Sequence, residues 1–349
     1  MGHIDAPKII HLQMIDPHRL EIYWDQEVVH ANQAECFHLT IDDTLIETVQ
    51  DDSAEWDVRP IYERVKKRTT LYIQHPVSKQ ALGKLKVSIS GHINNSLGLC
   101  ADQDKSYVVN YWQDFYSCHT NTSSGILIKS SFHVSREAHR KAAQIIDILL
   151  AKAPEIAHTM SALNAQLAIY GKTEDVYDLP EHRGGADMNR PVEGFGGIPE
   201  NPVTTISEKN VLRITEGPNQ TRYLNECILV HEFAHAIHLI GINHLKDSQL
   251  KVELEAAYHH AREANLWPNT YAISNHEEYF ATLTTIWFNV MAESIDGSWD
   301  GIRGPINRRS ELEIYDPAAY NLLAKIYDNK GLPAPWQDTP NNYPYLLTS

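Results

Sequence analysis

The chain has 349 residues, more than twice the usual size of one domain, so we expect two domains of unequal length. Apolar residues make up 42% and charged residues 21% of it, which excludes a disordered or collagen-like protein. The formal charge of −15 at pH 7 repels phosphate backbones, so nucleic acid is not an expected partner. The longest mainly apolar run, 145–151, is far shorter than the ~20 residues that cross a bilayer, and no membrane span is predicted.

The first 30 residues carry charged and polar side chains where a secretory signal needs an apolar stretch. We expect a secreted or extracytoplasmic protein whose leader is absent from this chain, and a cytoplasmic location stays open. The four cysteines are too few for a disulfide framework in so long a chain. We expect either buried free thiols or a single bridge between Cys100 and Cys118. The sequence does not predict an oligomeric state.

Residues 1–112 contain short runs in which apolar and polar residues alternate, the pattern of half-buried strands. These runs are 10–14, 20–24, 37–41, 71–73, 85–89 and 107–111. Because turn-forming residues separate them and helical periodicity is nearly absent, we predict an immunoglobulin-like antiparallel β-sandwich. The segment contains no catalytic cluster, so an accessory module for packing or substrate presentation is the expectation.

Residues 113–349 are predicted to form a mainly helical domain with a small sheet, which makes the whole chain α+β. Ser135 is placed to cap the first helix, which reaches about residue 150. Further helices are predicted at about 154–165, 222–242, 248–264, 276–293 and 317–329. Strands are predicted at 166–170 and at 203–206, the second as a sheet edge after the glycine- and proline-rich stretch 180–202.

The motif His231-Glu232-Phe233-Ala234-His235 lies within a helix that is apolar on nearly all sides. Such a helix is buried, and unpaired imidazoles inside it would be costly. Residues four apart stand one above the other, so His231 and His235 can ligate one Zn²⁺ ion, with Glu232 placed to take a proton from zinc-bound water. The alternatives are a chance match among 19 histidines and a purely structural zinc site.

The third ligand distinguishes classes of zinc peptidase. His238 and Gly241 stand where a metzincin has Gly and His, so that assignment fails. His238 lies about 10 Å along the helix from His231, too far to share the ion, and is expected to pack or to support the site.

Downstream, Ser274 and Glu277 have the spacing of a capping box at a helix start. That box would leave Glu278 free as the third ligand, with Glu277 as the competing candidate.

The segment 271–281, in which Asn275 and Glu278 precede Tyr-Phe-Ala, resembles the catalytic domain of anthrax lethal factor and related gluzincin metallopeptidases. The resemblance implies that Glu278 is the third zinc ligand and that Tyr271 supports the oxyanion. Packing before a helix is the alternative for Tyr271. Further motifs resemble little-characterised microbial zinc proteins, at 178–182, 194–197, 208–210, 266–267 and 315–317. Thr282 and Thr285 replace residues that often support the metal, so that support is expected to differ.

In gluzincins the strand before the zinc helix forms the edge of the cleft, where a peptide can add as an extra strand. The substrate-binding candidates on this strand are Val203 and Thr204, for which a plain sheet edge is the alternative. Gly196, Gly197 and Arg190 of the glycine-rich loop are the candidates expected to line the same cleft, where Arg190 can hold a substrate carboxylate. We therefore expect a zinc-dependent hydrolase with one Zn²⁺ ion, a metallo-endopeptidase acting on peptides or proteins. The alternatives are an amidohydrolase of non-peptide or modified substrates, and a degenerate zincin that serves as a binding protein.

Overall fold

The structure is a computed structural model that describes residues 5–46, 60–183, 192–246 and 249–337. It is α+β, and the chain folds into two compact units. The first comprises Met1–Phe115 with His182–Met188, and the second comprises Tyr116–Glu181 with Asn189–Ser349. The division follows Phe115, whereas the sequence predicts a boundary after residue 112, and the sequence does not predict that 182–188 belongs with the first unit.

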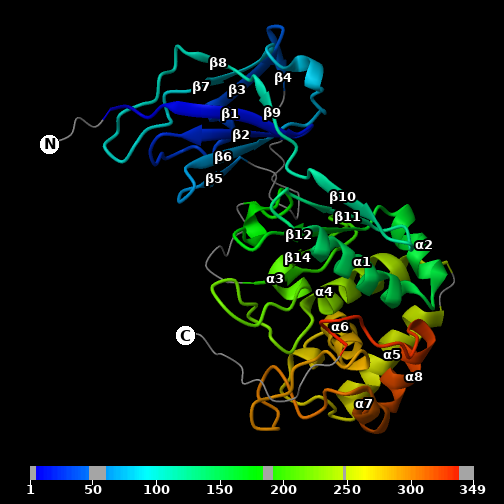
Figure 1. The fold of residues 1–349 in the computed structure, drawn as a ribbon. Helices are drawn as coiled ribbons and strands as arrows, with labels where there is room; N and C mark the ends of the chain where they lie inside the picture. The colour runs from blue at the N-terminus through cyan, green and yellow to red at the C-terminus, as the bar shows by residue number, and fades with distance from the viewer. Residues whose placement is uncertain (1–4, 47–59, 184–191, 247–248, 338–349) are drawn as a thin grey trace. The chain divides into compact units, whose positions relative to one another are not determined.

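Two sheets form the first unit (Figure 1). The strands are β1 (Ile9–Asp16), β2 (Arg19–Trp24), β3 (Phe37–Ile41), β4 (Thr44–Ile46), β5 (Ile61–Glu63), β6 (Arg68–Tyr72), β7 (Leu85–Ile89), β8 (Ser106–Val108) and β9 (Tyr111–Trp112), with 3₁₀ turns η1 (Ala34–Cys36) and η2 (Lys79–Ala81). The strand orders are β5-β6-β2-β1-β9 and β4-β3-β7-β8. Alternate residues of both sheets, such as Ile22 and Val87, meet in one hydrophobic core, as the period of two predicts.

Two details of the predicted sandwich are wrong. Strand β9 pairs with β1 in parallel, so the sheets are not purely antiparallel. The predicted strand 107–111 is two strands, because β8 pairs with β7 in one sheet while β9 joins the other. The strands expected at 10–14, 20–24, 37–41 and 85–89 are confirmed. The immunoglobulin-like topology stays a prediction.

A buried charge cluster joins Arg183 to the first unit. Glu21 of β2 is 1% exposed and accepts hydrogen bonds from the Arg183 guanidinium and from Tyr23 at 2.8 Å, and pairs with Arg68 at 3.3 Å. Burial alone would raise the pKa of Glu21, but Arg183 and Arg68 outweigh it and lower the pKa. This charge pairing accounts for the grouping of Arg183 with β-strands that precede it by more than a hundred residues.

The second unit combines one mixed sheet with the helices (Figure 1). The strands are β10 (Cys118–Asn121), β11 (Leu127–Ser130), β12 (Gln166–Tyr170), β13 (Gly194–Phe195) and β14 (Val203–Ser207); the helices are α1 (Arg136–Leu150), α2 (Pro154–Ala162), α3 (Glu208–Val211), α4 (Ile228–Ala236), α5 (Gln249–Glu263), α6 (His276–Trp287), α7 (Arg309–Tyr315) and α8 (Pro317–Ile326). The shorter turns are η3 (Val176–Asp178), η4 (Ile237–Gly241, a π-helical turn after α4), η5 (Ile242–His244) and η6 (Tyr271–Ile273). The strand order is β10-β11-β12-β14-β13, with β11, β12 and β14 parallel.

The helices follow the predicted pattern with shifted ends. Ser135 caps α1 as predicted, because its side chain accepts a hydrogen bond from Ala138 N. Helix α4 begins at Ile228 rather than at 222. Helix α6 ends at Trp287 rather than at 293 because Asn289 is left-handed, at φ 58°, and the following amide closes back on Thr285 O at 2.9 Å.

No helix among the described residues is both long and apolar enough to cross a bilayer. All four cysteines are free thiols, so the alternative of a Cys100–Cys118 bridge is wrong. Only Cys36 and Cys227 are buried.

Candidate metal centre

Helix α4 carries the predicted zinc-binding motif into the core of the second unit. Its apolar residues, such as Phe233, are buried, as the flanking sequence predicts. His231 and His235 are also buried, at 9% and 8% exposure. Glu232 is the one residue of α4 that is not buried. The helix therefore presents a single carboxylate toward accessible space beside two enclosed imidazoles.

The start of α4 is held by residues that sequence reasoning missed. Asn210 of α3 accepts a hydrogen bond from Ile228 N at 2.9 Å through Oδ1 and donates to Glu226 O at 3.0 Å through Nδ2. The buried Arg303 guanidinium donates to the Glu226 carboxylate, with Nε at 3.1 Å. Because the first N–H groups of a helix lack partners within it, Asn210 supplies the cap that Cys227 does not. The sequence pointed to this region only through the 208–210 motif, which did not predict a role for any of its residues.

The structure brings His231, His235 and Glu278 together. Glu278 Oε2 lies 3.1 Å from His231 Nε2 and 3.5 Å from His235 Nε2, and the three potential ligand atoms lie within 4.8 Å of one another. Among the described residues this is the only group of three or more His, Cys, Asp or Glu side chains that is close enough to hold a metal ion. Two imidazole nitrogens and one carboxylate oxygen are a donor set that fits Zn²⁺ with one position left open.

Glu278 reaches the histidines from the first turn of α6. Asn275 caps this helix, since its side-chain oxygen accepts a hydrogen bond from Glu278 N at 2.7 Å. The predicted capping box of Ser274 and Glu277 is wrong: Ser274 Oγ donates to Tyr271 O at 2.7 Å instead. It is nevertheless Glu278, and not Glu277, whose carboxylate lies beside both imidazoles.

The members of the cluster shift one another's pKa values. Burial alone would raise the pKa of Glu278, but hydrogen bonds from His231 and His235 bring it well below its usual range. Burial would lower the pKa of His231, yet the hydrogen bond to Glu278 and the charge of Glu232 raise it. The buried Nδ1 of His231 has no hydrogen-bond partner among the described residues. Thr285 Oγ1 donates to Thr282 O at 2.6 Å, which leaves it bonded to its own helix.

Strand β13 and Gly196, the residue that follows it, pack directly on the motif. A Cβ atom at Gly194 would lie 2.8 Å from Glu232 Cγ, and one at Gly196 would lie 2.5 Å from His235 Cβ. Carbon atoms make ordinary contact at roughly 3.5–4.0 Å, so only glycine fits at either position. Glu232 is only partly exposed, and the protein atoms around its carboxyl raise the pKa against the opposing effect of His231 and His235.

The predicted cleft edge is not where the sequence places it. Strand β14, which contains Val203 and Thr204, pairs with β12 on one side and β13 on the other, so it is an interior strand. Both side chains are buried, and Thr204 Oγ1 accepts a hydrogen bond from Gly197 N at 3.2 Å. The outermost strand of the described sheet beside α4 is β13. Arg190 lies outside the described residues.

Tyr271 and His238 occupy different environments. Tyr271 begins η6, which contacts α6, and is 48% exposed, while its backbone N–H donates to Ile302 O at 3.0 Å. His238 lies in the π-helical turn after α4 and is 2% exposed, with its ring centroid 5.6 Å from that of Phe280. Burial lowers the pKa of His238 to about 3, and it is not part of the His–Glu cluster.

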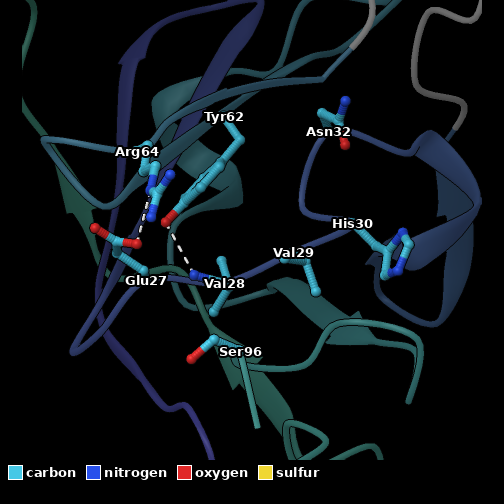
Figure 2. A pocket seen from close by; sticks show the side chains of 8 residues that line it. All are labelled: Glu27, Val28, Val29, His30, Asn32, Tyr62, Arg64 and Ser96. Carbon is cyan, nitrogen blue, oxygen red and sulfur yellow. Dashed lines mark hydrogen bonds and ion pairs between the residues drawn. The ribbon is translucent and has the colours of Figure 1, made fainter. Parts of the chain in front are cut away.

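A separate pocket belongs to the first unit. Figure 2 shows it beside the ion pair of Arg64 and Glu27, 2.7 Å apart, and the hydrogen bond from Val28 N to Tyr62 Oη, 3.0 Å long. Its volume is about 410 Å³, and the other lining residues are Val29, His30, Asn32 and Ser96. None of the predicted site residues lines it.

Comparisons with known proteins leave the family open. No protein-family model and no curated protein matches the chain. Among solved structures, the S-layer protein rSbsC(31-844) is 13% identical over 34% of this chain and 16% of its own, with a TM-score of 0.26. The PRO-PRO endopeptidase PPEP-2 from Paenibacillus alvei is 17% identical over 54% of this chain and 90% of its own, with a TM-score of 0.28. Yeast LTA4 hydrolase in complex with bestatin is 8% identical over 94% and 63%, with a TM-score of 0.18. Similarities this low carry no argument about fold or activity.

Proposed function

We propose that the chain is a zinc-dependent hydrolase, a metallo-endopeptidase in which His231, His235 and Glu278 hold one Zn²⁺ ion. The observation that supports this is that the three potential ligand atoms lie within 4.8 Å of one another, although His235 and Glu278 lie on different helices and are more than 40 positions apart in the sequence. A purely structural zinc site has four protein ligands, whereas the described cluster has three. When bound, the ion would supply Lewis acidity and lower the pKa of a water molecule.

The roles of the remaining residues follow from their placement. Glu232 adjoins His231 and is the accessible carboxylate of α4, so it would accept a proton from the attacking water and return it to the leaving amine. Tyr271 has an exposed side chain and would donate a hydrogen bond to the developing oxyanion.

Substrate would bind along β13, the outermost strand of the described sheet beside α4, by adding as a further strand. The backbone of Gly196, the residue after β13, would then lie against His235, and a side chain at this position would push the two apart. The first unit, proposed to be an immunoglobulin-like accessory module of a secreted or extracytoplasmic protein, supplies no residue to this site in our proposal.

Glu232→Gln tests the mechanism, with Glu277→Gln as the matched control because it makes the same change outside the cluster. Zinc content is measured by elemental analysis, and cleavage of a peptide library is followed with and without chelator. We expect both variants to retain one zinc ion, and only Glu232→Gln to lose turnover, by about 10²–10⁴-fold. A wild-type protein that keeps no zinc, or a Glu232→Gln variant with full activity, contradicts the proposal. Bound zinc without cleavage of any peptide excludes the peptidase assignment.

A further inference from the structure

Asp316 is a fully buried carboxylate at the start of α8, in the 315–317 motif that the proposed mechanism does not use. Its exposure is 0%, and its Oδ1 accepts a hydrogen bond from Ala319 N at 3.1 Å, which caps the helix. Its Oδ2 accepts two more hydrogen bonds, from Tyr279 Oη at 2.7 Å and from Trp267 Nε1 at 2.9 Å. A buried charge is costly unless donors satisfy it, and here three donors do so.

The two side chains that donate to Oδ2 flank the residues of the proposed site. Tyr279 directly follows Glu278 in the first turns of α6, and Trp267 precedes Tyr271 by four residues. The segment 267–279, which carries both site residues, is therefore bonded at each end to the same oxygen atom of Asp316. Simple capping of α8 would need only the bond from Ala319 N.

Trp267 is held in a conformation that bulky residues avoid. Its φ is 56°, in the left-handed region, although it is 2% exposed and packed in the core. Its backbone N–H donates to Tyr315 Oη at 3.0 Å, and its carbonyl accepts from Thr270 Oγ1 at 2.6 Å. Such a conformation persists only when neighbouring contacts offset its strain, and these contacts come from the residue before Asp316 and the residue before Tyr271.

We propose that Asp316 is a positioning residue for Glu278: through Tyr279 it fixes the rotation of α6, and through Trp267 it fixes the turn that leads into that helix. The inference rests on the proposed function, because it takes Glu278 as a metal ligand. A metal site tolerates displacements of only about 0.2 Å in ligand distance, so a small rotation of the first turn of α6 is enough to weaken binding. Residues that orient metal ligands in this way commonly alter metal affinity by about 10–100-fold when they are mutated.

The chain offers a matched pair of variants that separates positioning from stability. Tyr279 and Tyr327 are both 1% exposed and in the same core, and each hydroxyl has a buried polar neighbour. The Tyr327 hydroxyl lies 3.2 Å from Thr284 Oγ1, whereas the Tyr279 hydroxyl bonds to Asp316. Tyr279→Phe and Tyr327→Phe remove the same atom from comparable surroundings, but only the first cuts the connection to Asp316.

The experiment measures Zn²⁺ affinity by competition with a chromophoric chelator, together with the melting temperature and the visible spectrum of the Co²⁺-substituted protein. We expect Tyr279→Phe to weaken zinc binding by about 10–100-fold and to change the Co²⁺ spectrum, and Tyr327→Phe to stay within about twofold of wild type. Asp316→Asn is expected to match or exceed Tyr279→Phe. If Asp316→Asn does not fold, the Tyr279→Phe comparison decides alone.

Two results would overturn the inference in distinguishable ways. If wild type binds zinc tightly and Tyr279→Phe binds it equally well, Asp316 does not position Glu278, and the proposed function stands. If wild type binds no zinc, both the proposed function and the inference are wrong. Tight zinc binding without peptidase activity would leave the positioning role in place, because affinity is its readout.

Discussion

Adding one methyl group at Gly196, the residue directly after β13, tests how closely this segment controls the position of the metal ligands. In Gly196→Ala the new Cβ would lie 2.5 Å from His235 Cβ, 2.9 Å from its Cγ and 3.0 Å from its Cδ2. Ordinary carbon–carbon contacts are roughly 3.5–4.0 Å, so the backbone at position 196 and the His235 side chain must move apart by about 1 Å. That displacement is several times the ~0.2 Å that a metal–ligand distance tolerates.

We expect Gly196→Ala to lower both the stability of the fold and the affinity for zinc, and a separate assay measures each. Overpacking lowers the free energy of unfolding by about 1–3 kcal/mol, measured by urea denaturation. Displacement of His235 lowers zinc affinity by at least about tenfold, or ~1.4 kcal/mol, measured by chelator competition. Gly331→Ala is the control, because no atom lies within 4 Å of its Cβ position and its φ is not in the left-handed region. If Gly196→Ala is destabilised but binds zinc as tightly as wild type, the backbone at Gly196 has moved instead of His235, and this reasoning is refuted.

Two further predictions concern buried ionisable side chains away from the metal centre. Glu21→Ala removes the carboxylate that bonds to the buried Arg183, while Arg68 keeps its hydrogen bond to Glu63 at 2.6 Å. We expect urea denaturation to show a loss of about 3–5 kcal/mol, whereas the exposed Glu35→Ala changes little, and equal effects would contradict the assigned role. Burial, with the charge of His119, lowers the pKa of His139, so the folded state holds it neutral while the unfolded state protonates below about pH 6.5. Stability is therefore lost as pH falls below that value, by up to ~1.4 kcal/mol per pH unit, and His139→Gln should remove this component of the unfolding curve measured against pH.

Periodicity predicted the elements that extend over several residues. Each long periodic pattern indicates one buried face of an element. The alternating patterns at 20–24 and 85–89 correspond to strands, and the helical pattern after Ser135 corresponds to a helix, as predicted. The sequence missed β13 because a strand of two residues has no period to detect, and so it placed Val203 at a sheet edge. The sequence reasoning preferred Glu278 to Glu277 because of a capping box that does not form. Asn275, the residue after Ser274, has an equally suitable capping side chain and is the residue that caps the helix.

The contacts that support the site could not be predicted from the sequence, because their partners are far apart along the chain. Asp316 meets Tyr279 and Trp267 across 37 and 49 residues, and nothing local to any of them requires a partner at that distance. Asn210 likewise caps a helix that begins 18 residues later. Pattern and propensity describe neighbours along the chain, whereas these hydrogen bonds depend on how the finished helices pack.

The burial of Arg183 beside Glu21 limits how this protein can be dissected. A fragment that stops after Phe115 would retain the buried carboxylates of Glu21 and Glu63 with Arg68 but lose the second buried guanidinium that bonds to Glu21. A fragment that starts at Tyr116 would expose a guanidinium that is enclosed beside a carboxylate in the full chain. Neither unit is one continuous stretch of sequence. Swapping the β-rich half for that of another protein would therefore require transplanting the residues around 183 as well.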